Sequence, residues 1–253
     1  MEQVPKLDFK GKTALVTGAS RGIGDAISTH LATHGAHVIL VSRKREGLES
    51  VAQKIHQQGG QATVHPTHLG NLDDLHQMAQ TLKEQGTNID ILVNNAATNP
   101  FYGPLQEVTD AVFQKTFDVN VKGPLFLCQN LVPLMPKGSS IIHVSSVNAF
   151  RPPAFQGIYS MTKAAVIAMT KVQAKELAPL GIRVNTIAPG LTDTKFAKAL
   201  IDNPKLRASY IDHTPLDRPA APDEISGAVL YLASDLATYT TGTCLTVDGG
   251  YLS

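Results

Sequence analysis

The sequence lacks the features that mark secreted, membrane-bound or nucleic-acid-binding proteins. Only two of its 253 residues are cysteines, Cys128 and Cys244, and at this separation they form no metal or redox motif. The formal net charge is only +1, which leaves no basic field for nucleic acid. The sequence shows no apolar run of membrane-spanning length and no signal-peptide core near its start. We therefore expect a cytoplasmic protein without a nucleic-acid or membrane partner.

What the sequence does contain is an alternation of two hydrophobic patterns. Short apolar runs typical of strands alternate with amphipathic patterns typical of helices along almost the whole chain. This order predicts an α/β fold with a doubly wound parallel sheet and helices on both faces. With 43% hydrophobic residues and no linker, residues 1–253 are expected to form a single domain. The seven predicted strands span residues 13–17, 36–41, 62–65, 89–93, 140–145, 183–187 and 244–247.

The stretch TGASRGIG places three glycines between the first predicted strand and a helical pattern. Such a turn can bring backbone N–H groups and the positive end of a helix against a phosphate, with no Cβ in the way. Glycine-rich turns also close ordinary strand–helix units, so the motif alone leaves both interpretations open. Ligands of open parallel sheets bind beyond the carboxyl ends of the strands, where the strand order reverses. Candidate residues at these predicted ends are Gly18, Ser20, Arg21, Gly22, Ile23, Gly24, Ser42, Arg43, His68, Leu69, Asn95, Ala96, Ser146, Pro189 and Gly190.

Tyr159 and Lys163 stand four residues apart, which places a phenol and an ammonium on the same face of a helix. At ~4 Å and an effective dielectric of ~20, one positive charge favours a phenolate by ~4 kcal/mol. The pair therefore predicts a tyrosine whose pKa falls toward neutrality, as a general acid requires. An isolated pair of this kind is more often a plain surface contact. Ser146 and Asn120 count only in company with the pair, because a lone serine or asparagine is usually a cap or turn residue.

Several motifs occur together in a fixed order. They are TGxxxGxG at residues 17–24, NNA at residues 94–96, Asn120, Ser146, YxxxK at residues 159–163, and PG at residues 189–190. With these motifs the chain resembles the short-chain dehydrogenases/reductases, in their compact one-domain branch. The likeness runs from Gly11 to Gly250. It implies a single-domain Rossmann fold with a seven-stranded sheet and a nicotinamide dinucleotide as the carrier of hydride.

The resemblance also implies a role for each catalytic candidate. Tyr159 would donate its proton to a substrate carbonyl oxygen, or take it back from an alcohol, while Ser146 hydrogen-bonds the same oxygen. Lys163 would lower the pKa of Tyr159 and hold the nicotinamide ribose. Asn120 would support a water molecule that links Lys163 to solvent. These residues predict reversible reduction of a carbonyl to an alcohol.

The end of the second predicted strand indicates NADP(H) as the cofactor. Relatives that prefer NAD resemble this chain but carry an acidic residue at the position of Ser42. Ser42 does not repel a 2′-phosphate, Arg43 offers a forked set of donors for it, and Arg21 can close on the same group. The alternative is that Arg43 belongs to a solvated turn. At the other end of the cofactor, the resemblance implies that Thr192 and Thr194 bind the carboxamide.

Two positions depart from the pattern of the family. His68 stands where relatives usually carry an aspartate against the adenine, and it can accept a hydrogen bond from the adenine amino group only while it is neutral. Ala97 replaces a usual glycine and is expected to crowd the backbone near the cofactor. His65 and His68 lack a third ligand, so we expect no metal site. His143 lies inside a predicted strand and is expected to be a core residue.

The substrate would be bounded by residues 98–105, residues 148–156 and a helical lid at residues 191–215. This shell is rich in aromatic residues and poor in charge, which favours an apolar or aromatic carbonyl compound. The run NPFYG at residues 99–103 resembles the NADPH-dependent carbonyl and retinal reductases of the family. The aromatic candidates are Phe101, Tyr102, Phe150, Phe155 and Phe196.

Two other functions stay open from the sequence. The first is reduction of 3-oxoacyl groups on an acyl-carrier protein, whose acidic carrier would need basic residues such as Lys137 and Lys175 around the cleft mouth. The second is a sensor that binds NADP(H) without turnover, for which Arg43 would be needed but Tyr159 would not.

The sequence also indicates self-association. Residues 123–135 are apolar on nearly every side, so a helix there must be covered on both faces. Together with the alanine-rich residues 163–178, this segment predicts an interface of packed helices between two subunits. The family resemblance extends this prediction from a homodimer to a homotetramer.

Overall fold

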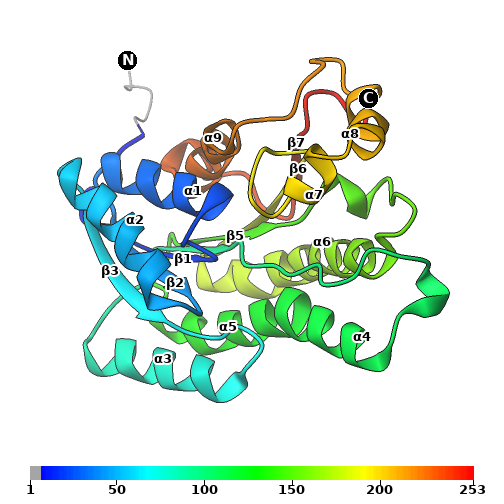
Figure 1. Ribbon diagram of the computed structural model, residues 1–253. Coiled ribbons are helices and arrows are strands. Elements are labelled where there is room, and N and C mark those ends of the chain that lie inside the picture. The colour runs from blue at the N-terminus through cyan, green and yellow to red at the C-terminus, as the bar shows by residue number, and fades with distance from the viewer. Residues whose placement is uncertain (1–6) are drawn as a thin grey trace.

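The computed structural model describes residues 7–253, so residues 1–6 of the predicted domain lie outside the described residues. The described residues form one sheet of seven parallel strands in the order β3-β2-β1-β4-β5-β6-β7, with helices on both faces (Figure 1). This is the predicted doubly wound, Rossmann-like α/β fold. The strands are β1 (Thr13–Thr17), β2 (His37–Ser42), β3 (Gln61–Pro66), β4 (Ile91–Asn94), β5 (Ser140–Val144), β6 (Arg183–Pro189) and β7 (Cys244–Val247).

The central strands are apolar without interruption because both of their faces are buried. Within β1, Ala14 and Val16 pack into one hydrophobic core while Leu15 packs into the other. The same alternation continues in β2, where Ile39 and Val41 join the core of Leu15. Strand order reverses between β1 and β4, since β2 and β3 lie on one side of β1 and β4 to β7 on the other. The reversal leaves a crevice at the carboxyl ends of β1 and β4.

Helices cover the two faces unequally (Figure 1). On one face lie α1 (Gly22–Thr33), α2 (Arg45–Gln57) and α9 (Pro222–Ala233). On the other face lie α3 (Leu72–Glu84), α4 (Asp110–Phe117), α5 (Gly123–Leu131) and α6 (Gly157–Leu177). Two short helices, α7 (Lys198–Ile201) and α8 (Pro204–Ile211), occupy the segment predicted as a lid. Among residues 7–253, none of the helices has both the length and the apolar surface that a membrane crossing requires.

Several helix ends follow directly from the sequence. Asn71 caps α3 by accepting a hydrogen bond from the backbone N–H of Asp73 at 3.0 Å, and Asn203 caps α8 in the same way through Lys205. The chain leaves α6 through a 3₁₀ turn and a left-handed glycine, Gly181 (φ 73°). These local signals fix where the long elements begin and end.

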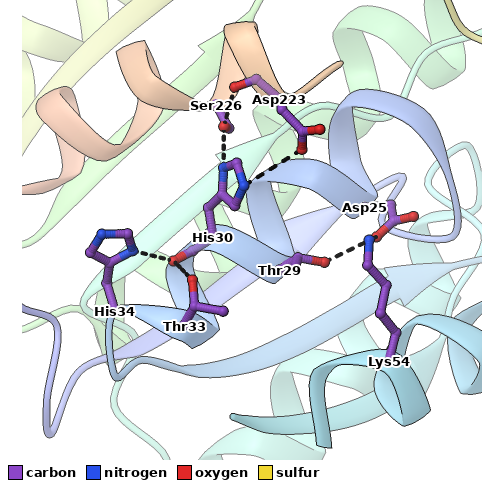
Figure 2. Close-up of polar contacts among 8 residues, drawn as sticks. All are labelled: Asp25, Thr29, His30, Thr33, His34, Lys54, Asp223 and Ser226. Atoms are coloured by element: carbon purple, nitrogen blue, oxygen red, sulfur yellow. Dashed lines mark hydrogen bonds and ion pairs between the residues drawn. The ribbon is translucent and has the colours of Figure 1, made fainter. Parts of the chain in front are cut away.

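The packing of α1 against α9 includes polar contacts (Figure 2). His30 Nδ1 lies 2.5 Å from Ser226 Oγ, and Ser226 donates its own hydrogen to the Asp223 carbonyl at 2.6 Å. Ser226 has no second hydrogen, so His30 Nδ1 must be the donor in this contact. On the other side of α1, Lys54 of α2 pairs with Asp25 at 3.0 Å. The three helices are thereby joined by side chains as well as by the apolar core.

All seven predicted strands agree with the structure to within two residues at either end; the largest differences are the start of β4 at Ile91 and the end of β6 at Pro189. The apolar segment 123–135 forms α5 followed by a 3₁₀ turn. Leu127 and Leu131 of α5 are buried within the chain, whereas Leu125 keeps 43% of its surface exposed. His143 is fully buried in β5, as predicted.

Candidate active site

A cleft of about 740 Å³ opens at the carboxyl ends of β1, β4, β5 and β6. It contains the point where the strand order reverses. Every residue predicted to bind the cofactor or to act in catalysis lines this cleft, apart from Asn120. The predicted residues that line it are Gly18, Ser20, Arg21, Gly22, Ile23, Gly24, Ser42, Arg43, His68, Leu69, Asn95, Ala96, Ser146, Tyr159, Lys163, Pro189, Gly190, Thr192 and Thr194.

The glycine turn between β1 and α1 has room for backbone only. Gly18 has a left-handed backbone (φ 67°), and a Cβ there would lie 2.8 Å from the Asn95 side-chain nitrogen. A Cβ at Gly24 would lie 2.6 Å from the same nitrogen and would overlap the Gly18 carbonyl. Arg21 occupies the N-cap of α1 without a side-chain cap, which leaves the first N–H groups of the helix available. The turn therefore fits a phosphate group held by backbone N–H donors.

Asn95 braces this turn from below. Its side-chain nitrogen donates to the Thr17 carbonyl at 2.9 Å and to the Gly18 carbonyl at 3.4 Å. The Thr17 hydroxyl accepts from the backbone N–H groups of Asn95 and Ala96, both at 3.0 Å. Because the side-chain nitrogen of Asn95 donates to the turn, this residue shapes the cleft and leaves its amide oxygen as the group for a ligand.

Positive charge gathers at one end of the cleft. Arg21 and Arg43 are exposed and line the cleft together with Lys44. Within residues 7–253, neither arginine forms an ion pair, whereas nearby Arg45 lies 3.6 Å from Glu49. Ser42 lines the cleft beside them without adding a negative charge. This end therefore has the chemistry to hold an anionic group.

Tyr159 lies in the first turn of α6 with only 8% of its surface exposed, and its ring centroid is 5.9 Å from that of Phe196. Burial raises the pKa of the Tyr159 phenol well above its ordinary value, a hydrogen bond with Ser146 partly offsets this, and nearby Tyr210 adds to it. The direction is opposite to the predicted fall toward neutrality. In this environment Tyr159 is protonated at neutral pH, which is the form from which a proton donor starts.

The burial of Lys163 beside Tyr159 shows why the pKa of the tyrosine rises when the sequence predicted a fall. The Lys163 ammonium is buried and donates to the Val144 carbonyl at 2.7 Å. Its nitrogen lies 5.5 Å from the centroid of the Tyr159 ring. Burial lowers the pKa of Lys163 itself to about 8. The prediction counted only the positive charge of Lys163, but desolvation is the largest effect on the pKa of both groups.

Asn120 is buried behind the cleft in a π-helical turn (Asp118–Lys122). Its Oδ1 accepts from the Thr98 backbone N–H at 2.8 Å, and its Nδ2 donates to the Thr98 carbonyl at 2.9 Å and to the Thr162 hydroxyl at 3.0 Å. Both side-chain hydrogens are therefore used within the protein. Asn120 thus joins the Thr98 loop to the helix of Tyr159. A water molecule at Asn120 would have to donate to the remaining lone pair of Oδ1 or to the backbone carbonyl.

His68 has a fixed tautomer. The backbone N–H of Gly70 donates to His68 Nδ1 at 3.1 Å, so this nitrogen is the acceptor and the neutral ring carries its hydrogen on Nε2. We predicted that the neutral ring would accept a hydrogen bond from an adenine amino group. The structure corrects this, because the only nitrogen left for a ligand is a donor. His65 contacts Thr67 Oγ1 at 3.0 Å instead of a second histidine.

The predicted aromatic shell is only partly assembled. Tyr102 and Phe196 line the cleft, whereas Phe101, Phe150 and Phe155 do not. Ala97 also lines the cleft and needs no left-handed backbone. At the mouth, a Cβ on Gly22 would lie 3.1 Å from the Thr194 methyl, which shows how closely the glycine turn approaches the chain after β6.

The cleft residues not singled out from the sequence include Asn148, Gln156 and Tyr210. They line the cleft, each with at most 5% of its surface exposed, and are hydrogen-bonded to one another. Residues 148–156 and 191–215 were each expected to bound the substrate. Their pairing carries no local signal, because Tyr210 lies 62 residues from Asn148 along the chain.

Comparison with known proteins identifies the family. Residues 18–252 match the family model described as Enoyl-(Acyl carrier protein) reductase. The chain is 39% identical to Dehydrogenase/reductase SDR family member 4 of Homo sapiens over 241 residues, 94% of this chain and 87% of the relative. It is 37% identical to Tropinone reductase-like 3 of Erythroxylum coca over 242 residues, 96% of this chain and 93% of the relative.

A solved structure agrees with these matches. The angucycline C-6 ketoreductase LanV, crystallised with bound NADP, superposes with a TM-score of 0.89 at 36% identity, and the match covers 97% of both chains. The relatives found by sequence and by structure thus carry dehydrogenase or reductase names, and each matches nearly the full length of this chain. The chain belongs to the short-chain dehydrogenase/reductase family of oxidoreductases.

Proposed function

We propose that the protein reduces a carbonyl compound to an alcohol with NADPH, reversibly. The observation that carries this proposal is the joint lining of one cleft by Tyr159, Ser146 and Lys163 at one end and by Arg21 and Arg43 at the other. A protein that only binds a dinucleotide needs the glycine turn and the arginines. It does not need a buried phenol beside a serine and a buried ammonium.

The residues at the basic end fit NADPH better than NADH. The glycine turn would take the pyrophosphate on the free N–H groups of α1. Arg21 and Arg43 would take the 2′-phosphate, since neither is paired within residues 7–253 and Ser42 leaves the site without a competing acid. His68 would donate from Nε2 to an acceptor on the adenine ring. The name of the solved ketoreductase, which includes bound NADP, supports this assignment.

At the other end, the chain handles the proton. NADPH, when bound, supplies the hydride that reduces the carbonyl carbon. Ser146 would hydrogen-bond the carbonyl oxygen and stabilise its growing negative charge, and Tyr159 would donate a proton to the same oxygen. The Lys163 ammonium favours the phenolate left on Tyr159. Thr192 and Thr194 would hold the carboxamide at the cleft mouth.

The substrate end favours an apolar or aromatic ketone. Tyr102 and Phe196 supply the aromatic surface, and the segment at residues 191–215 would act as a lid over them. The names of the relatives, a tropinone reductase-like protein and a ketoreductase, support a ketone substrate.

We also propose that the protein assembles as a homotetramer. Large apolar side chains stay exposed on three helices of one face, Phe113 on α4, Leu125 on α5, and Met161 and Val172 on α6. A second subunit would bury them and give a dimer, and membership of the family extends the proposal to a homotetramer. Light scattering at micromolar concentration measures the assembly directly: a monomer would contradict self-association, and a dimer would contradict the tetramer.

A cofactor and carbonyl panel tests the proposed function. NADPH and NADH oxidation would be compared with diketones, aryl ketones, retinal and 3-oxoacyl thioesters, using wild type, Tyr159→Phe and, as control, Tyr239→Phe, whose side chain is fully exposed. We expect NADPH preference, turnover of an aryl or alkyl ketone, and a loss of about 10²–10⁴ in kcat only in Tyr159→Phe. Turnover of carrier-linked thioesters alone would instead identify an acyl-carrier reductase. Tight NADPH binding without any turnover would identify a sensor.

A further inference from the structure

The hydrogen bonds among Asn148, Gln156 and Tyr210 form a closed ring. The Tyr210 hydroxyl donates to Asn148 Oδ1 at 3.1 Å and accepts from Gln156 Nε2 at 3.0 Å. Asn148 Nδ2 donates to Gln156 Oε1 at 3.2 Å, which completes the ring. All three residues are buried at the cleft wall. Each group donates once and accepts once, so losing any one of them leaves buried polar atoms without a partner.

The ring joins three separate parts of the site. Asn148 belongs to the 3₁₀ turn (Val147–Ala149) directly after Ser146, Gln156 is the N-cap residue of α6, and Tyr210 belongs to α8. Its corners therefore lie on the serine loop, on the helix that carries Tyr159, and on the segment predicted as a lid.

One corner contacts Ser146, and another contacts Ser160, the residue after Tyr159. The backbone N–H of Asn148 donates to Ser146 Oγ at 3.2 Å, which occupies a lone pair of that oxygen and fixes its position. The Gln156 carbonyl accepts from the backbone N–H and the hydroxyl of Ser160 at 3.0 and 2.9 Å, at the start of the helix that carries Tyr159. A shift of the ring would therefore move both Ser146 and Tyr159.

The chain just before Gln156 is strained. Phe155 has a left-handed backbone (φ 66°), although its side chain is large and half exposed. Such a conformation persists where surrounding contacts hold it in place. The Gln156 side chain, held by both other corners of the ring, supplies such contacts.

We propose that the Tyr210 hydroxyl latches α8 onto the serine loop and the start of α6, so that Asn148, Gln156 and Tyr210 act as positioning residues for Ser146 and Tyr159. The proposal rests on the proposed carbonyl reduction for its catalytic consequence. Opening of the α8 segment breaks the ring and releases the two reacting groups from their alignment. Closure restores both at once, so the site is competent only when the segment is docked.

The ring of Tyr210 has contacts that are separate from those of its hydroxyl. The Tyr210 ring stacks on Tyr251 with centroids 5.5 Å apart, and the Arg151 guanidinium lies 5.2 Å from the Tyr251 ring centroid. Tyr210→Phe would keep this stack and remove only the hydroxyl. Tyr251→Phe is a matched control, since Tyr251 is equally buried and its hydroxyl forms no hydrogen bond within residues 7–253.

The experiment compares wild type, Tyr210→Phe and Tyr251→Phe by ketone reduction, by NADPH affinity from cofactor fluorescence, and by hydrogen exchange of the backbone. For Tyr210→Phe we expect kcat to fall at least about tenfold while the Kd for NADPH stays within about twofold. Exchange should rise both in residues 198–211 and in residues 146–158. Tyr251→Phe should resemble wild type in all three measurements.

Tyr210→Phe with wild-type kcat and unchanged exchange would overturn the latch. An equal loss of kcat in Tyr251→Phe would also overturn it, because removal of a hydroxyl outside the hydrogen-bonded ring would then have the same effect. If Tyr210→Phe does not fold, Gln156→Met opens the ring at another corner and must show the same pattern. If wild type reduces no carbonyl, the proposed function fails, and the exchange measurement alone decides whether α8 is latched.

Discussion

The two ends of the cleft are built in different ways. The cofactor end is made of backbone: a glycine turn with no room for a Cβ at Gly18 or Gly24, braced by Asn95. The substrate end is made of side chains that meet across long stretches of sequence, as when Tyr210 reaches Gln156 from 54 residues away. One end is a backbone cradle that a side chain 78 residues from Thr17 holds in place, and the other is an assembly of side chains whose parts can separate.

This difference has a functional meaning. Relatives that share a cofactor can hold it with the same backbone shape, which stays the same when side chains differ. A substrate must enter, be enclosed and leave, which a wall held by a few hydrogen bonds permits. Damage to the cofactor end should therefore abolish binding, whereas damage to the substrate end should mainly lower kcat.

The largest expected effect on cofactor binding is that of Gly24→Ala. The added Cβ would lie 2.6 Å from the Asn95 side chain and would overlap the Gly18 carbonyl, so the turn must shift. We expect the Kd for NADPH to rise about 100-fold or more. Gly227→Ala in α9 is the matched control, because nothing lies within 4 Å of its new Cβ. It should leave NADPH binding unchanged and raise stability by about 0.5–1 kcal/mol. Wild-type binding by Gly24→Ala would show that the cradle does not depend on backbone shape.

A smaller effect should come from Arg43→Ala. Losing a charge-assisted contact to the 2′-phosphate should raise the Kd for NADPH about 10- to 100-fold and leave the Kd for NADH unchanged. Arg45→Ala is the control, since Arg45 stands two residues further on, is exposed and faces Glu49 instead of the cleft. Fluorescence titration with both cofactors measures the effect. Equal loss of NADPH and NADH affinity would mean that Arg43 acts on the shape of the turn and not on the phosphate.

Most of the fold and much of the cofactor end could be predicted from the sequence. Strands buried on both faces are continuous apolar runs, and the glycine turn lies directly after the first of them, so each signal is local. The residues at the carboxyl ends of the strands line one cleft because parallel strands bring those ends to one edge. The predicted boundaries differ slightly from the observed ones where the apolar run and the paired segment start at different residues. For β4 the apolar run begins at residue 89, but pairing begins only at Ile91.

The rest depended on burial and partners that spacing does not reveal. The spacing of Tyr159 and Lys163 predicted a charge effect, but both groups are desolvated, and desolvation has the opposite sign for the tyrosine. His68 was expected to accept a hydrogen bond, but the N–H of Gly70 fixes the tautomer in which the remaining nitrogen is a donor. The pairing of Tyr210 with Asn148 depends on where α8 folds back, which no local pattern records.

A separate, pH-dependent effect concerns β5, which pairs with β4 and β6 and leads to Ser146. His143 is fully buried there and donates from Nε2 to Gln173 Oε1 at 2.9 Å. Burial lowers the pKa of His143 to about 4 from an ordinary value near 6.5, and the Lys163 charge acts in the same direction. The unfolded chain therefore takes up a proton at a higher pH than the folded protein. Stability should fall as the pH drops from about 6.5 to about 4, by up to about 3 kcal/mol from this residue.

Urea unfolding at a series of pH values tests this, with His143→Asn compared with wild type and His76→Asn, which changes an exposed histidine of α3. His143→Asn should start less stable but lose less stability between pH 6.5 and 4, whereas His76→Asn should follow wild type. Because His143 lies inside β5, in the middle of the sheet, its protonation should destabilise the whole fold and not the α8 segment alone. If acid raised hydrogen exchange only in the α8 segment, the protonation that matters would lie at the substrate end and His143 would not be the acid-sensitive residue.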